Sequence, residues 1–216
     1  MGARQDSLIR LFQEGGYTCR LKVMPRITRQ DIALAGMVED TDGVYRALGG
    51  RLPHFPLRVG SWDVMVNGIP VELDEERHFN RYRAITLASR LYETIAGLDA
   101  GLYMRLCREK EPDCLRAAGW RGNWTNPSCE KQFGPGDPER VLGKNGAPRW
   151  KQRAFYDFLK DATWLSPSRR VVRFSIWEQL DVGGQVRSLN ELLKGYAPGG
   201  WRDEVVSRFK QRALLR

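Results

Sequence analysis

Hydrophobic and polar positions alternate along this chain with two periods, which predict helices and strands in a mixed order. Apolar residues recur at helical spacing in segments 7–13, 80–98, 149–162, 188–193 and 201–215, and more weakly in 30–37 and 41–48. Alternation with period two predicts strands at 17–23 and 170–176, and a hairpin within 62–74. This order predicts an α/β or α+β sandwich in which helices flank a central mixed sheet.

The turn of the hairpin is predicted at Asn67-Gly68. Both residues can adopt positive φ, and the apolar residues on either side are mostly β-branched. Together these features form the strongest short-range hairpin signal. A two-residue loop places Val64 opposite Val71 and Asp63 opposite Glu72.

Acidic side chains gather on this hairpin. Glu72 and Asp74 alternate with Leu73 and so share one face, where Asp63 lies opposite Glu72. Cross-strand partners lie about 4.5–5.5 Å apart, so like charges here need a cation between them. Carboxylate ligands suit Mg²⁺ or Mn²⁺, and the pattern predicts a metal site at Asp63, Glu72 and Asp74. The alternative is a solvent-exposed hairpin face that carries acids without a metal.

Length and composition indicate a folded protein outside the membrane. Hydrophobic residues make up 42% of the 216 residues, which is enough for a sizeable core. We expect one domain over residues 1–216, with a less regular insertion at about 99–148. No apolar run approaches the roughly 18 residues of a membrane helix, and the first residues lack an apolar signal core, so we expect a cytoplasmic protein.

Positive charge is concentrated in the last third of the chain. Residues 139–216 hold 16 Lys and Arg against 8 Asp and Glu, whereas residues 1–138 hold 19 against 18. Arginine outnumbers lysine 27 to 8, and arginine binds phosphate bidentately. Arginine-rich codon usage in the source genome is the alternative explanation. A basic region beside an acidic metal cluster fits a nuclease.

Four segments together resemble the PD-(D/E)xK nuclease superfamily, and in particular the branch near the very-short-patch repair endonucleases. They are the first helix with the strand after Gly16-Tyr17, the hairpin acids followed by His78, an arginine-bearing helix at 80–87 or 150–159, and the strand at 170–174. They span most of the chain around the insertion. The resemblance implies a restriction-endonuclease-like core and Mg²⁺-dependent hydrolysis of DNA phosphodiester bonds, in restriction, phage defence or repair.

The resemblance also implies roles for individual residues. Asp63 matches the metal-bridging acid, Glu72 matches the acid that begins the (D/E)xK element, and Asp74 stands where most of the superfamily has lysine. The branch often has an acid there, usually followed by glycine, where this chain has Glu75. His78 matches the histidine that follows, which implies that it orients or deprotonates the attacking water. The alternative for His78 is a surface histidine near a helix start.

Because Asp74 stands where most of the superfamily has its catalytic lysine, we look for that lysine on a helix. Lys151 begins a helix that is predicted to pack on the sheet, and we take it as the candidate catalytic lysine. Alternatively, Lys151 is an exposed contact to a phosphate or simply faces solvent. Arg83 is the second candidate for the catalytic role of the lysine. The expected contacts to nucleic-acid phosphates are Arg83, Arg149, Arg153 and Arg173.

The four cysteines do not form a recognisable metal motif. Cys107, Cys114 and Cys129 follow one another at spacings of seven and fifteen, and Cys19 lies far from them in sequence. Structural zinc sites usually contain cysteine pairs with two to four residues between them. We therefore expect free thiols in preference to a structural Zn²⁺.

Two functions remain open. The first is a Mg²⁺-dependent endonuclease acting on DNA, with RNA as an alternative substrate and a homodimer as an alternative assembly. The second is a non-catalytic nucleic-acid-binding or assembly protein on a nuclease fold. Three convergent carboxylates favour the first function, because a protein that only binds nucleic acid has little reason to keep them.

Overall fold

Helices predominate in the computed structural model, which describes residues 2–117, 124–165, 170–195 and 200–214. In chain order the elements are α1 (Ala3–Glu14), β1 (Cys19–Arg20), α2 (Arg29–Leu34), α3 (Val38–Ala47), β2 (Val64–Val66), β3 (Ile69–Asp74), η1 (Glu76–His78), α4 (Arg81–Leu87), α5 (Leu91–Thr94), α6 (Ala100–Glu109), α7 (Glu111–Ala117), α8 (Pro127–Phe133), α9 (Pro148–Ala162), η2 (Thr163–Leu165), β4 (Val172–Ser175), β5 (Gln179–Val182), β6 (Gln185–Ser188), α10 (Leu189–Leu193) and α11 (Gly200–Leu214).

The central sheet has four strands in the order β1-β2-β3-β4. The first three strands are antiparallel, and β4 returns parallel to β3 after the chain has passed through α4 to α9. Val64 pairs with Val71, which is the predicted hairpin register. Asn67 and Gly68 both have positive φ, at 46° and 82°. The expected mixed sheet flanked by helices is confirmed.

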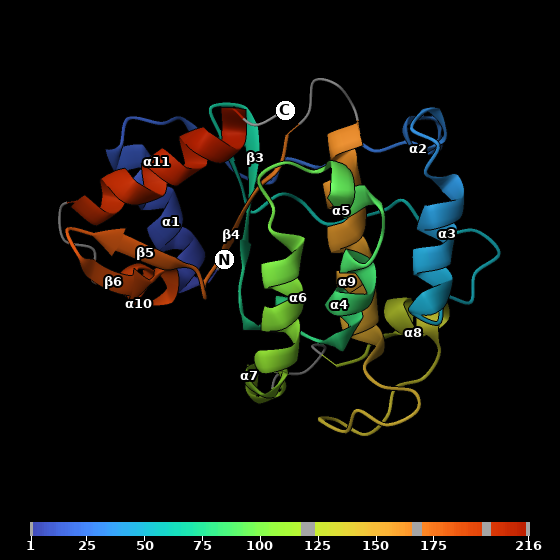
Figure 1. Ribbon diagram of the computed structural model, residues 1–216. Coiled ribbons are helices and arrows are strands. Elements are labelled where there is room, and N and C mark those ends of the chain that lie inside the picture. The colour runs from blue at the N-terminus through green and yellow to red at the C-terminus, as the bar shows by residue number, and fades with distance from the viewer. Residues whose placement is uncertain (1, 118–123, 166–169, 196–199, 215–216) are drawn as a thin grey trace.

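The two faces of this sheet differ in polarity. Val71, Leu73, Val172 and Phe174 belong to a hydrophobic cluster with residues of α1, α10 and α11. Figure 1 shows these three helices on one side of the strands, and α4, α5, α6 and α9 on the other side. Because side chains alternate along a strand, the residues between these apolar ones point toward α9. They are the charged residues of β3 and β4, and they are buried.

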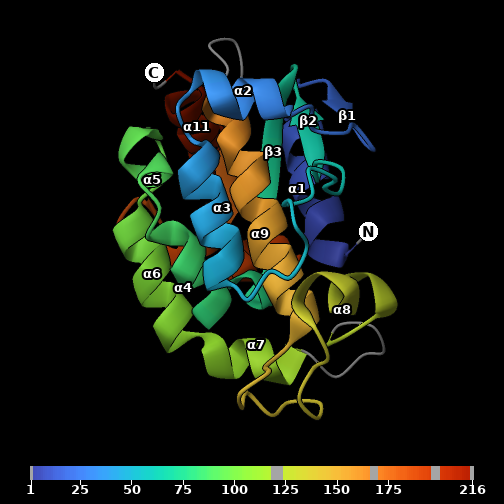
Figure 2. The same ribbon diagram turned by 90° about the vertical axis from the view of Figure 1, so that its right-hand side faces the viewer.

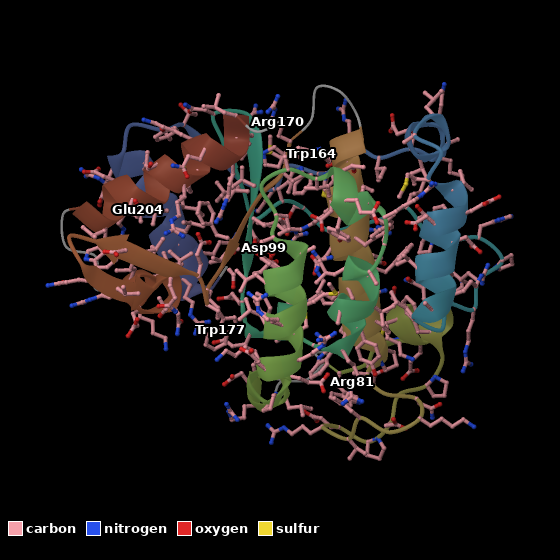
Figure 3. The ribbon with its side chains drawn as sticks, in the orientation of Figure 1. Arg81, Asp99, Trp164, Arg170, Trp177 and Glu204 are labelled. Atoms are coloured by element: carbon pink, nitrogen blue, oxygen red, sulfur yellow. The ribbon has the colours of Figure 1, made fainter. Side chains whose placement is uncertain are left out.

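A second hydrophobic cluster lies on the far side of α9. Tyr45 of α3 packs there against Phe155 of α9, with ring centroids 5.0 Å apart. Figure 2 shows α3 and α4 beside α9, and α8 at its lower end. Trp177, labelled in Figure 3, packs against both clusters. Helix α9 therefore has an apolar side in this second cluster and a charged side toward the sheet.

Several elements differ from the sequence-based expectation. The helix expected at 80–98 is divided into α4 and α5, and the Ser89 hydroxyl accepts a bond from the Leu91 amide at 3.1 Å between them. Strand β1 has only two residues, and the insertion at 99–148 contains α6, α7 and α8. The hairpin of β5 and β6, which turns at Gly183-Gly184, was not expected. Among the residues whose structure is described, none of the helices has the length and hydrophobicity of a membrane span.

Candidate active site

Glu72 of β3 is buried and paired with Lys160 of α9. The Lys160 ammonium donates to both carboxylate oxygens of Glu72 at 2.8 Å, and to the Ser61 carbonyl at 2.8 Å. These bonds engage an ammonium group that has three N–H donors. Burial raises the pKa of Glu72 to about 7, and the Lys160 charge opposes that rise. The protein therefore balances this carboxyl group with a cation of its own.

Asp74, two residues further along the same strand face, is balanced by a different cation. Its carboxylate accepts hydrogen bonds from Arg173 at 2.7 Å and from the Tyr103 hydroxyl at 3.0 Å. The parallel register of β3 and β4 places Glu72 beside Arg173 and Asp74 beside Ser175. Strand β4 thus brings its arginine next to the acids of β3.

Two aspartates of α9 extend this cluster. Asp161 accepts from Arg173 at 2.6 Å, from Arg83 at 2.8 Å and from the Tyr92 hydroxyl at 2.8 Å. Asp157 lies 3.7 Å from the Arg173 guanidinium, and the Arg173 Nη2 donates to its carbonyl at 3.2 Å. We call the following residues the buried charge network: Glu72, Asp74, Asp157, Asp161, Arg83, Lys160 and Arg173.

His78 of η1 lies at one end of the buried charge network. Its Nδ1 is 2.9 Å from Asp157 Oδ2 and 3.2 Å from Asp74 Oδ1. Burial would raise the pKa of Asp157, but His78 and then Arg173 hold it well below its ordinary value. Single ligand atoms of Asp74, His78 and Asp157 all lie within 4.8 Å of one another, so these three residues could hold a metal ion.

Asp63 lies at the edge of the network, beside a cavity. Its carboxylate accepts from the Leu73 amide at 2.8 Å, and its own amide donates to Glu72 at 3.1 Å. Burial raises the pKa of Asp63. The cavity, which we call the Asp63 cavity, has a volume of about 270 Å³ and is lined by Gly2, Gln5, Asp63, Leu73, Glu75, Arg77, His78 and Arg153.

Carboxyl groups outnumber cations within the buried charge network. Its four carboxyl groups face the three fixed cations of Arg83, Lys160 and Arg173. Asp63 at its edge adds a fifth acid, beside a cavity that Arg77 and Arg153 also line. The raised pKa values of Glu72 and Asp63 have the direction expected where burial and crowding disfavour ionised carboxylates. A divalent cation at the edge of the network would offset this excess.

The structure brings together Asp63, Glu72, Asp74 and His78, as expected from the sequence. It does not place the expected lysine, Lys151, beside them. Lys151 does not line the Asp63 cavity; its ammonium lies over the Tyr82 ring, 5.5 Å from the centroid. The lysine that contacts an acid of the site is Lys160, nine residues later on the same helix. That separation corresponds to about 13.5 Å along a helix axis.

Two of the four arginines that were expected to contact phosphate are buried. Arg83 and Arg173 are only 1% and 3% exposed, and both are ion-paired with acids of the buried charge network. Neither can reach a nucleic acid without breaking those pairs. Arg153 lines the Asp63 cavity, and Arg149 lies one turn earlier on α9 and bonds to Gln152.

Three charged residues of the site were missed from the sequence. Asp157, Lys160 and Asp161 have the spacing of one helix face, and this spacing was the available signal. Their partners come from β3, η1, α4 and β4, which lie far away in the chain. Only the fold identifies this face as buried.

The cysteines described by the structure are free thiols. Burial raises the pKa of Cys107 to about 11 and that of Cys114 to about 12. Both are therefore protonated at neutral pH, whereas zinc is bound by thiolates. Cys129 lies in the first turn of α8, where its amide donates the capping hydrogen bond to the side-chain oxygen of Asn126 at 3.0 Å.

Comparison with known proteins identifies a family. Residues 43–195 match the model of a family described as "Family of unknown function (DUF7255)". No curated protein and no solved structure matches the chain. The matched range contains the hairpin, α9 and β4, so the whole buried charge network lies inside it.

Proposed function

The chain belongs to this family of unknown function, and we propose that it is a Mg²⁺-dependent endonuclease that hydrolyses phosphodiester bonds in DNA. The observation that carries the proposal is the meeting of Asp63, Asp74, Asp157 and His78 around one end of β3. These residues come from the hairpin, η1 and α9, and two of them, Asp63 and His78, line a polar cavity.

Oxygen-rich side chains fit the expected metal. Asp74 and Asp157 would supply oxygen ligands to Mg²⁺ or Mn²⁺ beside His78, and Asp63, which lines the adjoining cavity, would be a further oxygen donor. When bound, such an ion polarises a phosphate and lowers the pKa of a coordinated water. Glu72 is already engaged by Lys160, so we assign Glu72 to holding the strand and its charge in place.

His78 is suited to move a proton. The two carboxylates at its Nδ1 favour a proton on that nitrogen, which leaves Nε2 as the basic atom. His78 also lines the Asp63 cavity, where a water could approach it. In this role His78 accepts a proton from the attacking water at Nε2, and Asp157 stabilises the imidazolium that forms.

The decisive experiment is DNA cleavage with and without metal. The wild-type protein should nick or cleave plasmid DNA with Mg²⁺ or Mn²⁺ and not with EDTA. Asp63→Asn should abolish that cleavage, and the fold should persist because Asp63 is only partly buried and the asparagine oxygen can still accept from the Leu73 amide. His78→Gln should slow cleavage by about 10²–10⁴-fold, the usual contribution of general base catalysis.

The matched control is Asp203→Asn, which removes one carboxylate from an exposed position on α11 and should leave cleavage unchanged. Circular dichroism and DNA binding in EDTA should be the same in all variants. Wild-type rates in both Asp63→Asn and Asp74→Asn would show that the site assignment is wrong.

The non-catalytic alternative is favoured by one observation. Glu72 and Asp74 already pair with cations of the protein, so their repulsion is offset without a metal. A protein that binds DNA in EDTA but never cleaves DNA or RNA with any divalent ion would support this second function.

A further inference from the structure

Arg153 of α9 lines the Asp63 cavity without an acidic partner. Within the described parts of the chain, its guanidinium forms no hydrogen bond and no ion pair at 4.0 Å or less. The buried arginines Arg83 and Arg173, by contrast, are both paired with carboxylates. Partly buried charges are ordinarily compensated by a partner. Arg153 is therefore available to an anion that enters the cavity.

Other positive charges surround Arg153. Burial, and next the charge of Arg77, lower the pKa of Arg153 to about 10; Arg149 acts in the same direction, and Asp157 opposes it. Arg153 thus stays protonated at neutral pH among like charges. Arg77 lines the same cavity. An anion between Arg77 and Arg153 would relieve their repulsion.

The start of α1 forms another wall of the cavity. Gly2 and Gln5 line it, and Gly2 is an N-cap residue that supplies no side-chain bond to the helix. The first amide groups of a helix have no partners within it and carry partial positive charge. Gln5 donates to the Asp63 carbonyl at 2.8 Å, which attaches this helix end to the hairpin.

We propose that Arg153, Arg77 and the start of α1 form a phosphate subsite, which holds one phosphate group of the substrate strand beside the phosphate that is cleaved. The nature of the substrate rests on the proposed function. The cavity volume of about 270 Å³ lies below the ~300–1,000 Å³ of sites that enclose drug-sized ligands. It accordingly suits a phosphate group and is too small for a stacked base pair.

Inorganic phosphate is the first probe, because it tests the subsite without catalysis. Thermal unfolding of the full chain in EDTA should be compared in sodium phosphate and in sodium chloride at equal ionic strength. Phosphate at about ten times its Kd should raise the Tm of the wild type by about 3–6 °C. Arg153→Gln should lose this shift. Arg108→Gln, which removes an exposed arginine of α6, should retain it.

Binding of a single-stranded oligodeoxynucleotide in EDTA is the second readout. Arg153→Gln should weaken binding about 10-fold, and the slope of log K against log salt should fall by about 0.7, as for the loss of one phosphate contact. Arg153→Lys should recover part of the affinity, because the charge remains without the bidentate geometry.

Two results would overturn the subsite. One is a wild-type Tm that phosphate does not raise, and the other is an Arg153→Gln variant that phosphate stabilises as much as the wild type. Both assays exclude metal, so they are independent of cleavage. A protein that binds phosphate at Arg153 but cleaves nothing would retain the subsite and lose the proposed nuclease function.

Discussion

Lys160 and Lys151 lie on the same helix in different surroundings. Lys160 is 7% exposed and bonded to Glu72, whereas Lys151 is half-buried over the Tyr82 ring. At the sequence level both are lysines in one amphipathic helix, and Lys151 has more arginines around it. Choosing between them requires knowing which turn of α9 faces β3, and periodicity does not contain that information.

Replacement of the two lysines should separate their roles. Lys160→Met should lower the free energy of unfolding by about 3–5 kcal/mol, because it leaves Glu72 as a buried acid without its partner. Lys151→Met removes the same side chain from the same helix and should cost only about 1 kcal/mol, the size of a cation–π contact that solvent still reaches. Urea denaturation at pH 7, followed by circular dichroism, measures both values.

The double variant Lys160→Met/Glu72→Gln provides the control for this pair. Its cost should be smaller than the sum of the two single costs, because residues in direct contact are coupled. If the two lysine replacements destabilise the protein equally, or if the double variant is additive, the buried pair does not have the importance assigned to it.

At the scale of elements, the features that could be predicted are those determined by neighbouring residues. The turn at Asn67-Gly68 and the apolar side of α9 follow from local residue types and spacing, and both are confirmed. The hairpin of β5 and β6 was missed although Gly183-Gly184 marks its turn. Its strands are half-exposed and lack a clear run of β-branched residues.

The charged side of α9 shows why the rest of the site could not be predicted. The polar side of an amphipathic helix ordinarily faces solvent. Here Asp157 and Asp161 are buried because Arg173 of β4 and Arg83 of α4 lie against them. These contacts join elements that are placed together only by the crossover from β3 to β4.

The hairpin turn permits a test at the same scale. Gly68 has a φ of 82°, where a Cβ atom is strained, so Gly68→Ala should destabilise the protein by about 1 kcal/mol or more. Gly60→Ala is the matched control, because Gly60 is exposed, lacks a positive φ and has open space around it. That variant should lie within about 0.5 kcal/mol of the wild type in urea denaturation. Equal effects of the two variants would contradict the turn assignment.

Across the whole molecule, part of the positive charge of residues 139–216 is taken up in ion pairs with the protein's own acids. Lys160 and Arg173 neutralise acids of β3, and Arg208 and Arg212 of α11 both pair with Glu178. The net charge of residues 139–216 therefore overstates the charge that this segment presents to solvent. The unpaired position of Arg153 is more informative about an anionic partner than the total charge is.

The sheet connects the two hydrophobic clusters, and this predicts that they unfold together. Leu8 is fully buried in the cluster between the sheet and helices α1, α10 and α11. Phe155 lies in the second cluster, on the side of α9 that faces away from the sheet. The strands between them supply apolar residues to one side and bind α9 through the buried charge network on the other. A change in one cluster should therefore lower the stability of both, as in a single cooperative domain.

Leu8→Ala tests this coupling. The cavity it creates should cost about 2–5 kcal/mol, and hydrogen exchange should accelerate by the same factor in the amides of α9 as in those of α11. Leu34→Ala, at a position that is 80% exposed, should change neither rate. If α9 keeps its wild-type protection while α11 loses it, the two clusters unfold separately. The ion pairs between β3 and α9 would then be an interface between two folding units, and the site would depend on how those units dock.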